Sequence, residues 1–180
     1  MKKLYKILFL MLLCHSFILS NAYPEEAVLA FRLVHPDHDK LTNISPSKAR
    51  VDKKQYELFS KGNENYWVDK KIELNTKDFI NADVQCMTMD SSNNTKWETI
   101  EPGSDFPSDA ACAVVLYFSK DSQNKIETLT EKNLTRRLSI IYNNRLLMAP
   151  IIREKMTGET MSICCFTYNE AMNLKSAMKR

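Results

Sequence analysis

Glycine and histidine are both scarce in this sequence of 180 residues, and each shortage narrows what the protein can do. The chain contains three Gly and three His, and no His follows His38. A catalytic dyad of His with Ser or Cys could therefore use only His35 or His38. The glycine-dependent phosphate loop, the GxSxG elbow and the HExxH zinc motif are all absent. The sequence predicts no enzymatic reaction, no resident metal and no cofactor.

Long apolar runs are also lacking, with one exception at the N-terminus. Lysines at positions 2, 3 and 6 precede an apolar run over residues 7–19, and small residues follow at Ser20 and Ala22. This pattern is typical of a cleavable secretory signal, and it predicts a signal peptide over residues 1–22 with cleavage after Ala22. The alternatives are an uncleaved anchor or, less well matched, lipidation at Cys14. We therefore expect a secreted or periplasmic protein whose mature chain has no membrane span.

A strong net charge is the next feature that the mature chain lacks. The whole sequence has 25 basic and 22 acidic residues, and the signal segment holds three of the lysines and no acid. Removing that segment leaves 22 basic residues against 22 acidic ones, so the mature chain is formally neutral. The basic clusters are only pairs, such as Arg136-Arg137. This distribution provides no global basic field for nucleic acid, which we exclude as a partner.

Four cysteines remain once the signal is removed, namely Cys86, Cys112, Cys164 and Cys165. An even number in an oxidising compartment favours disulfides, but four cysteines allow three pairings between which the sequence does not choose. Buried free thiols are the alternative. Adjacent residues of a strand point to opposite faces, so Cys164 and Cys165 are expected to have different neighbours rather than to bond each other. No CxxC or CxxH spacing favours a zinc site.

Most of the mature chain has the pattern of short strands separated by polar turns. Alternating or continuous apolar residues predict strands over 27–34, two runs within 53–74, 83–90, 111–119, 137–142, 145–152 and 159–166, with a brief edge segment at 96–100. The run at 111–119 is rich in β-branched and aromatic residues, as a central strand is. Asn143-Asn144 is expected to form a two-residue hairpin turn, because Asn tolerates positive φ.

Three helices are expected among these strands. Thr76 is the expected cap of a short helix over 77–82, and residues 120–133 place Ile126 and Leu129 one turn apart. Thr167 and Glu170 have the spacing of a capping box at the start of a last helix that ends near residue 178. The stripe of this helix consists of Ala171, Leu174 and Met178.

These patterns predict an α+β fold, with a mainly antiparallel β-sheet and two main helices packed on one face. The expected organisation is a signal peptide over 1–22, an arm of one strand and a loop over 23–62, and an α+β domain over 63–180.

One long segment resembles a known family. The stretch "LTEKNLTRRLSIIYNNRLLMAPIIREKMTGETMSICCFTYNEAMNL", residues 129–174, is similar to the head subdomain of the first periplasmic domain of SecD and SecDF, a protein-translocase subunit. The family's "RLAI"-type strand corresponds to 137–140, its "APVIRE"-type strand to 149–154, and its "FTxxEA" helix start to 166–171. Upstream, "AFRLVHPD" over 30–37 is similar to the family's "FRLV" lead-in, and "YWVDKKIELNTKDFINADV" over 66–84 to the segment that follows.

The sequence departs from the family pattern at several points. Thr135 replaces a Gly before the first of these strands, and Asn143-Asn144 replaces an Asp-Gly turn. The resemblance also covers only the head, whereas SecD is a multi-span membrane protein that uses the proton gradient to help exported polypeptides leave the translocon. That role needs the spans, so the resemblance implies contact with polypeptide rather than transport. The residues expected to build the motif are Leu138, Ile140, Asn143, Asn144, Pro150, Arg153, Glu154, Thr167 and Glu170.

Several polar and aromatic residues are candidates for function. The segment "HPDHD", 35–39, could offer His35 and His38 to a metal, but it lacks a designated further ligand. The acids Glu101, Asp105 and Asp109 lie in a Pro- and Ser-rich loop, where a solvated surface is the simpler interpretation. Trp67 is expected in the core. Trp97 and Phe106 lie in loop-like sequence and are the candidate polypeptide-contact residues.

The sequence therefore predicts a non-enzymatic exported binding module that contacts polypeptides or envelope proteins through sheet edges or an apolar patch. Translocase components are candidate partners, and an accessory role in protein export follows from the resemblance. Two alternatives are a metal-dependent or hydrolytic enzyme that uses the His35/His38 loop, and an envelope domain that assembles with itself.

Overall fold

The computed structural model describes residues 28–41, 45–89, 95–101, 103–104, 106–108 and 110–178. The predicted signal peptide and its cleavage after Ala22 lie outside these residues, as do Asp105 and Asp109. Within the described ranges, no helix combines the length and the hydropathy that a membrane span requires.

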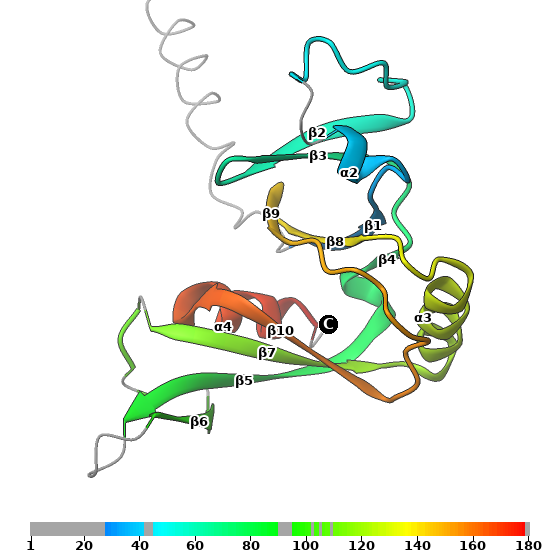
Figure 1. Cartoon of the computed structure of the whole chain (residues 1–180). Helices are drawn as coiled ribbons and strands as arrows, with labels where there is room; N and C mark the ends of the chain where they lie inside the picture. Colours follow the sequence, from blue (N-terminus) through cyan, green and yellow to red (C-terminus); the bar gives the residue numbers. More distant parts are fainter. Residues whose placement is uncertain are drawn as a thin grey trace, which may run out of the picture.

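The described strands form three antiparallel sheets (Figure 1). The β8 sheet has the order β4 (Leu74–Asn75), β1 (Leu29–Leu33), β8 (Leu138–Tyr142) and β9 (Arg145–Met148). The β7 sheet has the order β10 (Thr160–Thr167), β7 (Ala111–Phe118), β5 (Phe79–Met89) and β6 (Thr95–Ile100). A hairpin of β2 (Tyr56–Lys61) and β3 (Glu64–Asp69) forms the third sheet. Figure 1 shows the β8 sheet between this hairpin and the β7 sheet.

Two main helices complete the fold. Helix α3 (Lys120–Lys132) follows β7 and contacts β4 and β7, whereas α4 (Tyr168–Met178) follows β10 and packs on β5 and β7. A short helix α2 (His38–Leu41) follows β1, and a single turn η1 (Thr76–Asp78) precedes β5. The predicted α+β class is confirmed, and the predicted single sheet is divided into the β8 sheet, the β7 sheet and the hairpin.

All five residues of strand β8 are buried, and all are apolar or aromatic except Ser139, whose hydroxyl donates to the Arg32 carbonyl at 2.7 Å. Successive residues of a strand point to opposite faces, and β8 has a hydrophobic cluster on each side. Leu138, Ile140 and Tyr142 join the large cluster shared with the β7 sheet and the two helices. Ile141 joins a smaller cluster with Tyr66 and Val68 of the hairpin. The strand that carries the family motif is therefore structural framework, buried on both faces.

The predicted turn after β8 is confirmed. Asn143 and Asn144 both have positive φ, 45° and 60°, the combination that a two-residue hairpin turn with both central residues left-handed requires. Asn143 also exchanges two bonds with Val28: its N–H donates to the Val28 carbonyl at 3.0 Å, and its side-chain oxygen accepts from the Val28 N–H at 2.9 Å. The turn thus ties the hairpin to the residue that precedes β1.

The end of the family motif differs in part from expectation. Strand β9 is an edge strand that ends before Pro150, where no ladder donor is needed, and the β8–β9 register shifts between Ile140 and Ile141. Arg153 and Glu154, two of the residues expected to build the motif, are both exposed, and within the described ranges they form no ion pair with each other. Neither carboxylate nor guanidinium is desolvated there, so little favours the pairing.

The prediction of a short helix over 77–82 is wrong. Only one turn forms, over Thr76–Asp78, and Phe79 already starts β5. The cap is Asn75 rather than Thr76: the Asn75 side chain accepts from the Lys77 N–H, and Asp78 accepts from the Asn75 N–H, both at 2.9 Å. Residues from Phe79 onward pair with β7 and bury Ala82 and Val84, and this ladder outweighs the local helical preference.

The expected helix 120–133 and the last helix are confirmed. Ser119 caps α3 by accepting from the Ser122 N–H at 3.2 Å. At α4 the Thr167 N–H donates to Glu170 at 2.9 Å and the Glu170 N–H donates to the Thr167 hydroxyl at 3.3 Å, which is the predicted capping box. The expected stripe of α4 is buried.

Candidate functional site

Trp97 projects from β6 and is 48% exposed, although a large aromatic side chain is normally buried. Its partner across the β5–β6 ladder is Met87, which is 44% exposed. Successive residues of a strand point to opposite faces. Cys86 and Ile100 point into the core, so Met87, one residue after Cys86, and Trp97, three residues before Ile100, point outward. An indole beside a flexible thioether forms an adaptable apolar surface. We call Met87, Trp97 and strand β6 the Trp97 face.

The edge of the sheet lies beside this pair. The β5–β6 ladder is unbroken from Val84–Ile100 to Met89–Thr95, and β6 is the last strand of the sheet among the described residues. The outward amides and carbonyls of such an edge can pair with an added strand. One exposed ion pair, Lys96–Glu98 at 2.5 Å, lies on β6, and the hydrogen bond from Lys96 lowers the pKa of Glu98. The arrangement can bind an extended polypeptide and carries no nucleophile.

Phe106, the other candidate contact residue, has a different environment. It is half-buried, and its ring centroid lies 5.5 Å from that of Tyr168. The Tyr168 hydroxyl in turn donates to the Ser104 carbonyl at 3.2 Å, so the loop is tied to the start of α4. Among the described rings, Phe106 contacts Tyr168 and not Trp97. The structure therefore does not unite the two aromatic candidates in one patch.

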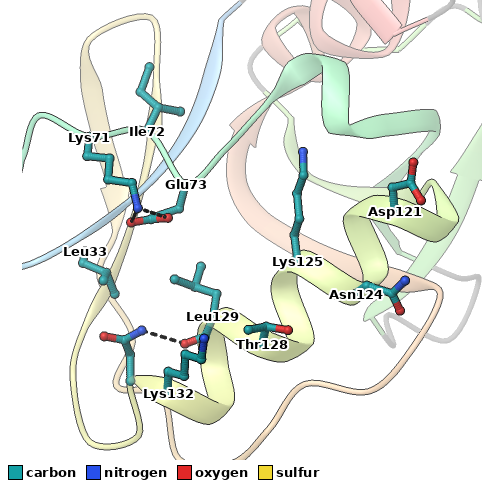
Figure 2. A pocket seen from close by; sticks show the side chains of 11 residues that line it. Leu33, Lys71, Ile72, Glu73, Asp121, Asn124, Lys125, Thr128, Leu129 and Lys132 are labelled. Carbon is teal, nitrogen blue, oxygen red and sulfur yellow. Dashed lines mark hydrogen bonds and ion pairs between the residues drawn. The ribbon is translucent and has the colours of Figure 1, made fainter.

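A second candidate surface is an open groove of about 760 Å³ between α3 and the segment before β4 (Figure 2). Leu33, Ile72 and Leu129 supply its apolar lining, and Ile72 is 43% exposed. Figure 2 shows Lys71, Ile72 and Glu73 on one wall and the α3 side chains on the other. Such a groove can hold an apolar side chain between polar walls.

The charges of this groove are largely paired. Lys71 contacts Glu73 at 2.9 Å, which raises the pKa of Lys71. Lys125 reaches Asp78 at 2.8 Å. Burial alone would raise the pKa of Asp78, but hydrogen bonds from Lys125, the Asn75 amide and Ser122 outweigh it and lower the pKa. Of the lining lysines, Lys132 has no ion-pair partner among the described residues.

The two histidines of the 35–39 loop are used in packing. His38 is buried and stacks on Tyr66, with ring centroids 4.6 Å apart. His35 lies 4.7 Å from the ring of Tyr56, and its Nδ1 accepts from the Asp37 N–H at 3.1 Å. Within the described ranges, no three His, Cys, Asp or Glu side chains gather closely enough to hold a metal ion.

Sequence reasoning missed Met87 and Ile72. Met87 could have been found, since a strand that buries Val84 and Cys86 must expose the residue after Cys86 on its other face. Ile72 had no such signal. Its exposure depends on the groove beside α3, and this groove forms between segments that are far apart in sequence.

Residues 98–180 match the family model described as SecDF, P1 head subdomain. The chain therefore carries a domain like the SecD/SecDF P1 head, as its motifs predicted. The protein translocase subunit SecD of Treponema pallidum (strain Nichols) is 43% identical over 51 residues, which are 28% of this chain and 9% of that protein. This chain thus spans a small part of that relative.

Two solved structures share the fold. One is described as a membrane component SecDF that enhances protein export, and the other as SecDF in a super-membrane-facing form. Each has a TM-score of 0.50 and 20% identity over 86% of this chain. The matched regions are 63% of the first of those chains and 19% of the second.

Proposed function

We propose that this protein is an exported, non-enzymatic binding module that contacts unfolded polypeptides or envelope proteins and assists protein export. The observation that carries the proposal is the Trp97 face, an exposed apolar pair beside a sheet edge, in a domain like the head of an export component. One of the two solved structures that share the fold is of SecDF, described as a membrane component that enhances protein export. Translocase components are accordingly included among the proposed partners.

Two features support export of the chain itself. The N-terminal pattern is that of a secretory signal, with cleavage proposed after Ala22. Cys86 and Cys112 form a disulfide that joins β5 to β7, and such bonds persist in oxidising compartments. We place the protein in the periplasm or outside the cell.

The proposed mode of contact is addition of an extended segment to β6. Main-chain hydrogen bonds from the edge would supply affinity for any unfolded chain, regardless of its sequence. Trp97 would select for an apolar side chain on the added strand, since cross-strand neighbours lie close together. Met87, the partner of Trp97 on β5, would extend the apolar surface. Phe106 is included as a lesser contact at the rim, because it is packed against Tyr168.

The test is binding of a fluorescently labelled, unfolded exported polypeptide to the purified protein, followed by fluorescence anisotropy. Trp97→Ala should weaken binding at least tenfold, because truncating a central aromatic contact commonly costs about 2 kcal/mol. Leu134→Ala is the matched control, since Leu134 is 46% exposed and lies outside the Trp97 face. Equal loss in both variants, or wild-type affinity in Trp97→Ala, would contradict the proposal.

A second experiment addresses the partners. The protein carrying an affinity tag is used to capture proteins from the native envelope, with Trp97→Ala as the comparison. Recovery of unfolded exported proteins or translocase subunits by the wild type alone supports the module. Capture of a single unrelated protein, equally by both, contradicts it. Self-association through β6 would appear as a dimer in sedimentation that Trp97→Ala dissociates, and it would favour the self-assembling domain instead.

An enzymatic role for the His35/His38 loop is not proposed. His38 is buried against Tyr66 and the half-buried ring of His35 packs on Tyr56, so both imidazoles take part in aromatic packing.

A further inference from the structure

Strand β10 is interrupted at its two cysteines. Its ladder with β7 pairs Ile163 with Val114 and Phe166 with Cys112, so Cys164 and Cys165 together face one residue of β7. This is a β-bulge, and Cys165 has a positive φ of 77°. Adjacent residues of a regular strand would point to opposite faces, which was the expectation from the sequence. The bulge overturns that expectation by turning both side chains to the surface.

The result is a pair of exposed thiols in direct contact. The Sγ atoms of Cys164 and Cys165 lie 3.2 Å apart, and both residues are exposed. To bond, the two sulfurs must close from 3.2 Å to about 2.05 Å, and the backbone of the bulge must adjust to close the small ring between adjacent residues. Both residues are exposed, so no core side chain would have to be displaced. The other two cysteines of the described chain are already joined, as Cys86–Cys112. They are also nearly inaccessible to solvent.

We propose that Cys164 and Cys165 form a reversible redox site, in which the dithiol is converted into a disulfide between the adjacent residues by exchange with an external disulfide. The partner is a small disulfide of the glutathione class, which can approach because both thiols are exposed. The edge position of β10 leaves the site open on one side of the sheet.

The exchange takes place in two steps. One Cys thiolate attacks a sulfur of the external disulfide, forms a mixed disulfide and releases the first external thiolate. The neighbouring Cys thiolate then attacks the protein sulfur of that mixed disulfide and releases the second external thiolate. The two thiol protons pass to the two released thiolates. The protein loses two electrons and two protons, and the external disulfide is reduced to two thiols.

The contact between the thiols distinguishes this site from two ordinary exposed cysteines. Isolated thiols would stop at the mixed disulfide or link two chains, because no resolving thiol is near. Here the second thiol is already in contact with the first. Oxidation should therefore end within the chain and leave no adduct.

The experiment incubates the full protein in buffers with increasing ratios of oxidised to reduced glutathione, followed by acid quenching, alkylation and tryptic digestion. The tryptic peptide 156–175 contains Cys164 and Cys165 and no other cysteine, so its mass reports the site alone. The linked peptides 78–96 and 97–120 report the Cys86–Cys112 bond as an internal control of the fold. We expect peptide 156–175 to lose two hydrogens and to escape alkylation, while the linked pair stays unchanged.

Cys165→Ser and Cys164→Ser form a matched pair of variants. Each keeps one exposed thiol and removes the other, so each should accumulate a stable glutathione adduct where the wild type does not. Accumulation of adducts or of intermolecular dimers by the wild type would overturn the proposal. Retention of two alkylatable thiols at every glutathione ratio would overturn it as well.

A second measurement does not depend on how the variants fold. Phenylarsine oxide binds two thiols that are close together, and the reduced wild-type protein should retain it at a one-to-one ratio on peptide 156–175. Prior oxidation with glutathione disulfide should abolish this retention. Failure of the reduced wild type to retain the arsenical would contradict the inferred site.

Discussion

The β7 sheet has two edges, and they are built differently. Strand β6 pairs with β5 without interruption over six residue pairs and presents Trp97 beside Met87. Strand β10, at the opposite edge, is interrupted by the bulge at Cys164 and Cys165. A regular edge accepts an added strand, whereas a bulge disturbs the register that such a strand would need. We therefore expect the β6 edge to receive polypeptide and the β10 edge to exchange disulfides at its two thiols.

The largest expected effect concerns the Cys86–Cys112 disulfide, which joins β5 to β7, the two strands between the edges. Replacing Cys86 and Cys112 together by Ala should lower the free energy of unfolding by about 3 kcal/mol, since the bond closes a loop of 26 residues. Urea unfolding, followed by tryptophan fluorescence, measures the loss. Hydrogen exchange should show both β6 and β10 less protected. Loss of protection in only one of these two strands would contradict the view that a single cooperative sheet supports both edges.

A smaller effect on stability is expected from Asp78, which lies directly before β5, the strand that pairs with β6. Asp78→Asn removes a carboxylate that accepts from Lys125, Ser122 and the Asn75 amide. We expect a loss of about 1–2 kcal/mol at pH 7. Thermal unfolding of the variant and the wild type gives this difference.

The difference in the free energy of unfolding between the wild type and Asp78→Asn should also depend on pH. The pKa of Asp78 is lower in the folded protein than its ordinary value, so its stabilisation is present above the unfolded pKa of about 4 and is lost as the pH falls through the folded pKa. Wild type and Asp78→Asn should therefore differ at pH 7 and converge at strongly acidic pH. A constant difference over the whole range would show that the charge of Asp78 does not matter.

The smallest effect concerns the Asn143-Asn144 turn, which lies in the β8 sheet and belongs to neither edge of the β7 sheet. Asn144→Gly should raise the free energy of unfolding by about 0.5 kcal/mol, because the left-handed φ of 60° suits Gly better. Asn144→Ala should lower it by a similar amount, as Ala tolerates this conformation poorly. Neither variant should alter polypeptide binding or the oxidation of Cys164 and Cys165. An effect on either edge would indicate coupling through the β8 sheet.

Local patterns predicted much of the fold. The Asn143-Asn144 turn, the Thr167–Glu170 capping box and the stripe of α4 all depend on residues close in sequence, where chemistry alone selects the conformation. The helix expected over 77–82 failed because pairing with β7, more than 30 residues away in the chain, decides the conformation of residues 79–82.

The site was less predictable for the same reason. Trp97 is a candidate from the sequence because it lies in a loop-like segment, and the structure does leave it exposed. Phe106 has the same kind of sequence context, yet it packs against Tyr168 of α4, a contact that no local pattern indicates. The contact between Cys164 and Cys165 depends on a bulge, which one extra residue in a ladder creates and periodicity does not reveal.

The proposed function depends most on β6 as the edge that receives polypeptide. Hydrogen exchange with mass spectrometry, on the protein with and without a saturating unfolded exported polypeptide, tests this directly. We predict slower exchange of the amides of residues 95–100 in the complex, with residues 160–167 and the groove segment 71–73 unchanged. Protection of β10 or of the groove, with β6 unaffected, would contradict polypeptide binding at β6.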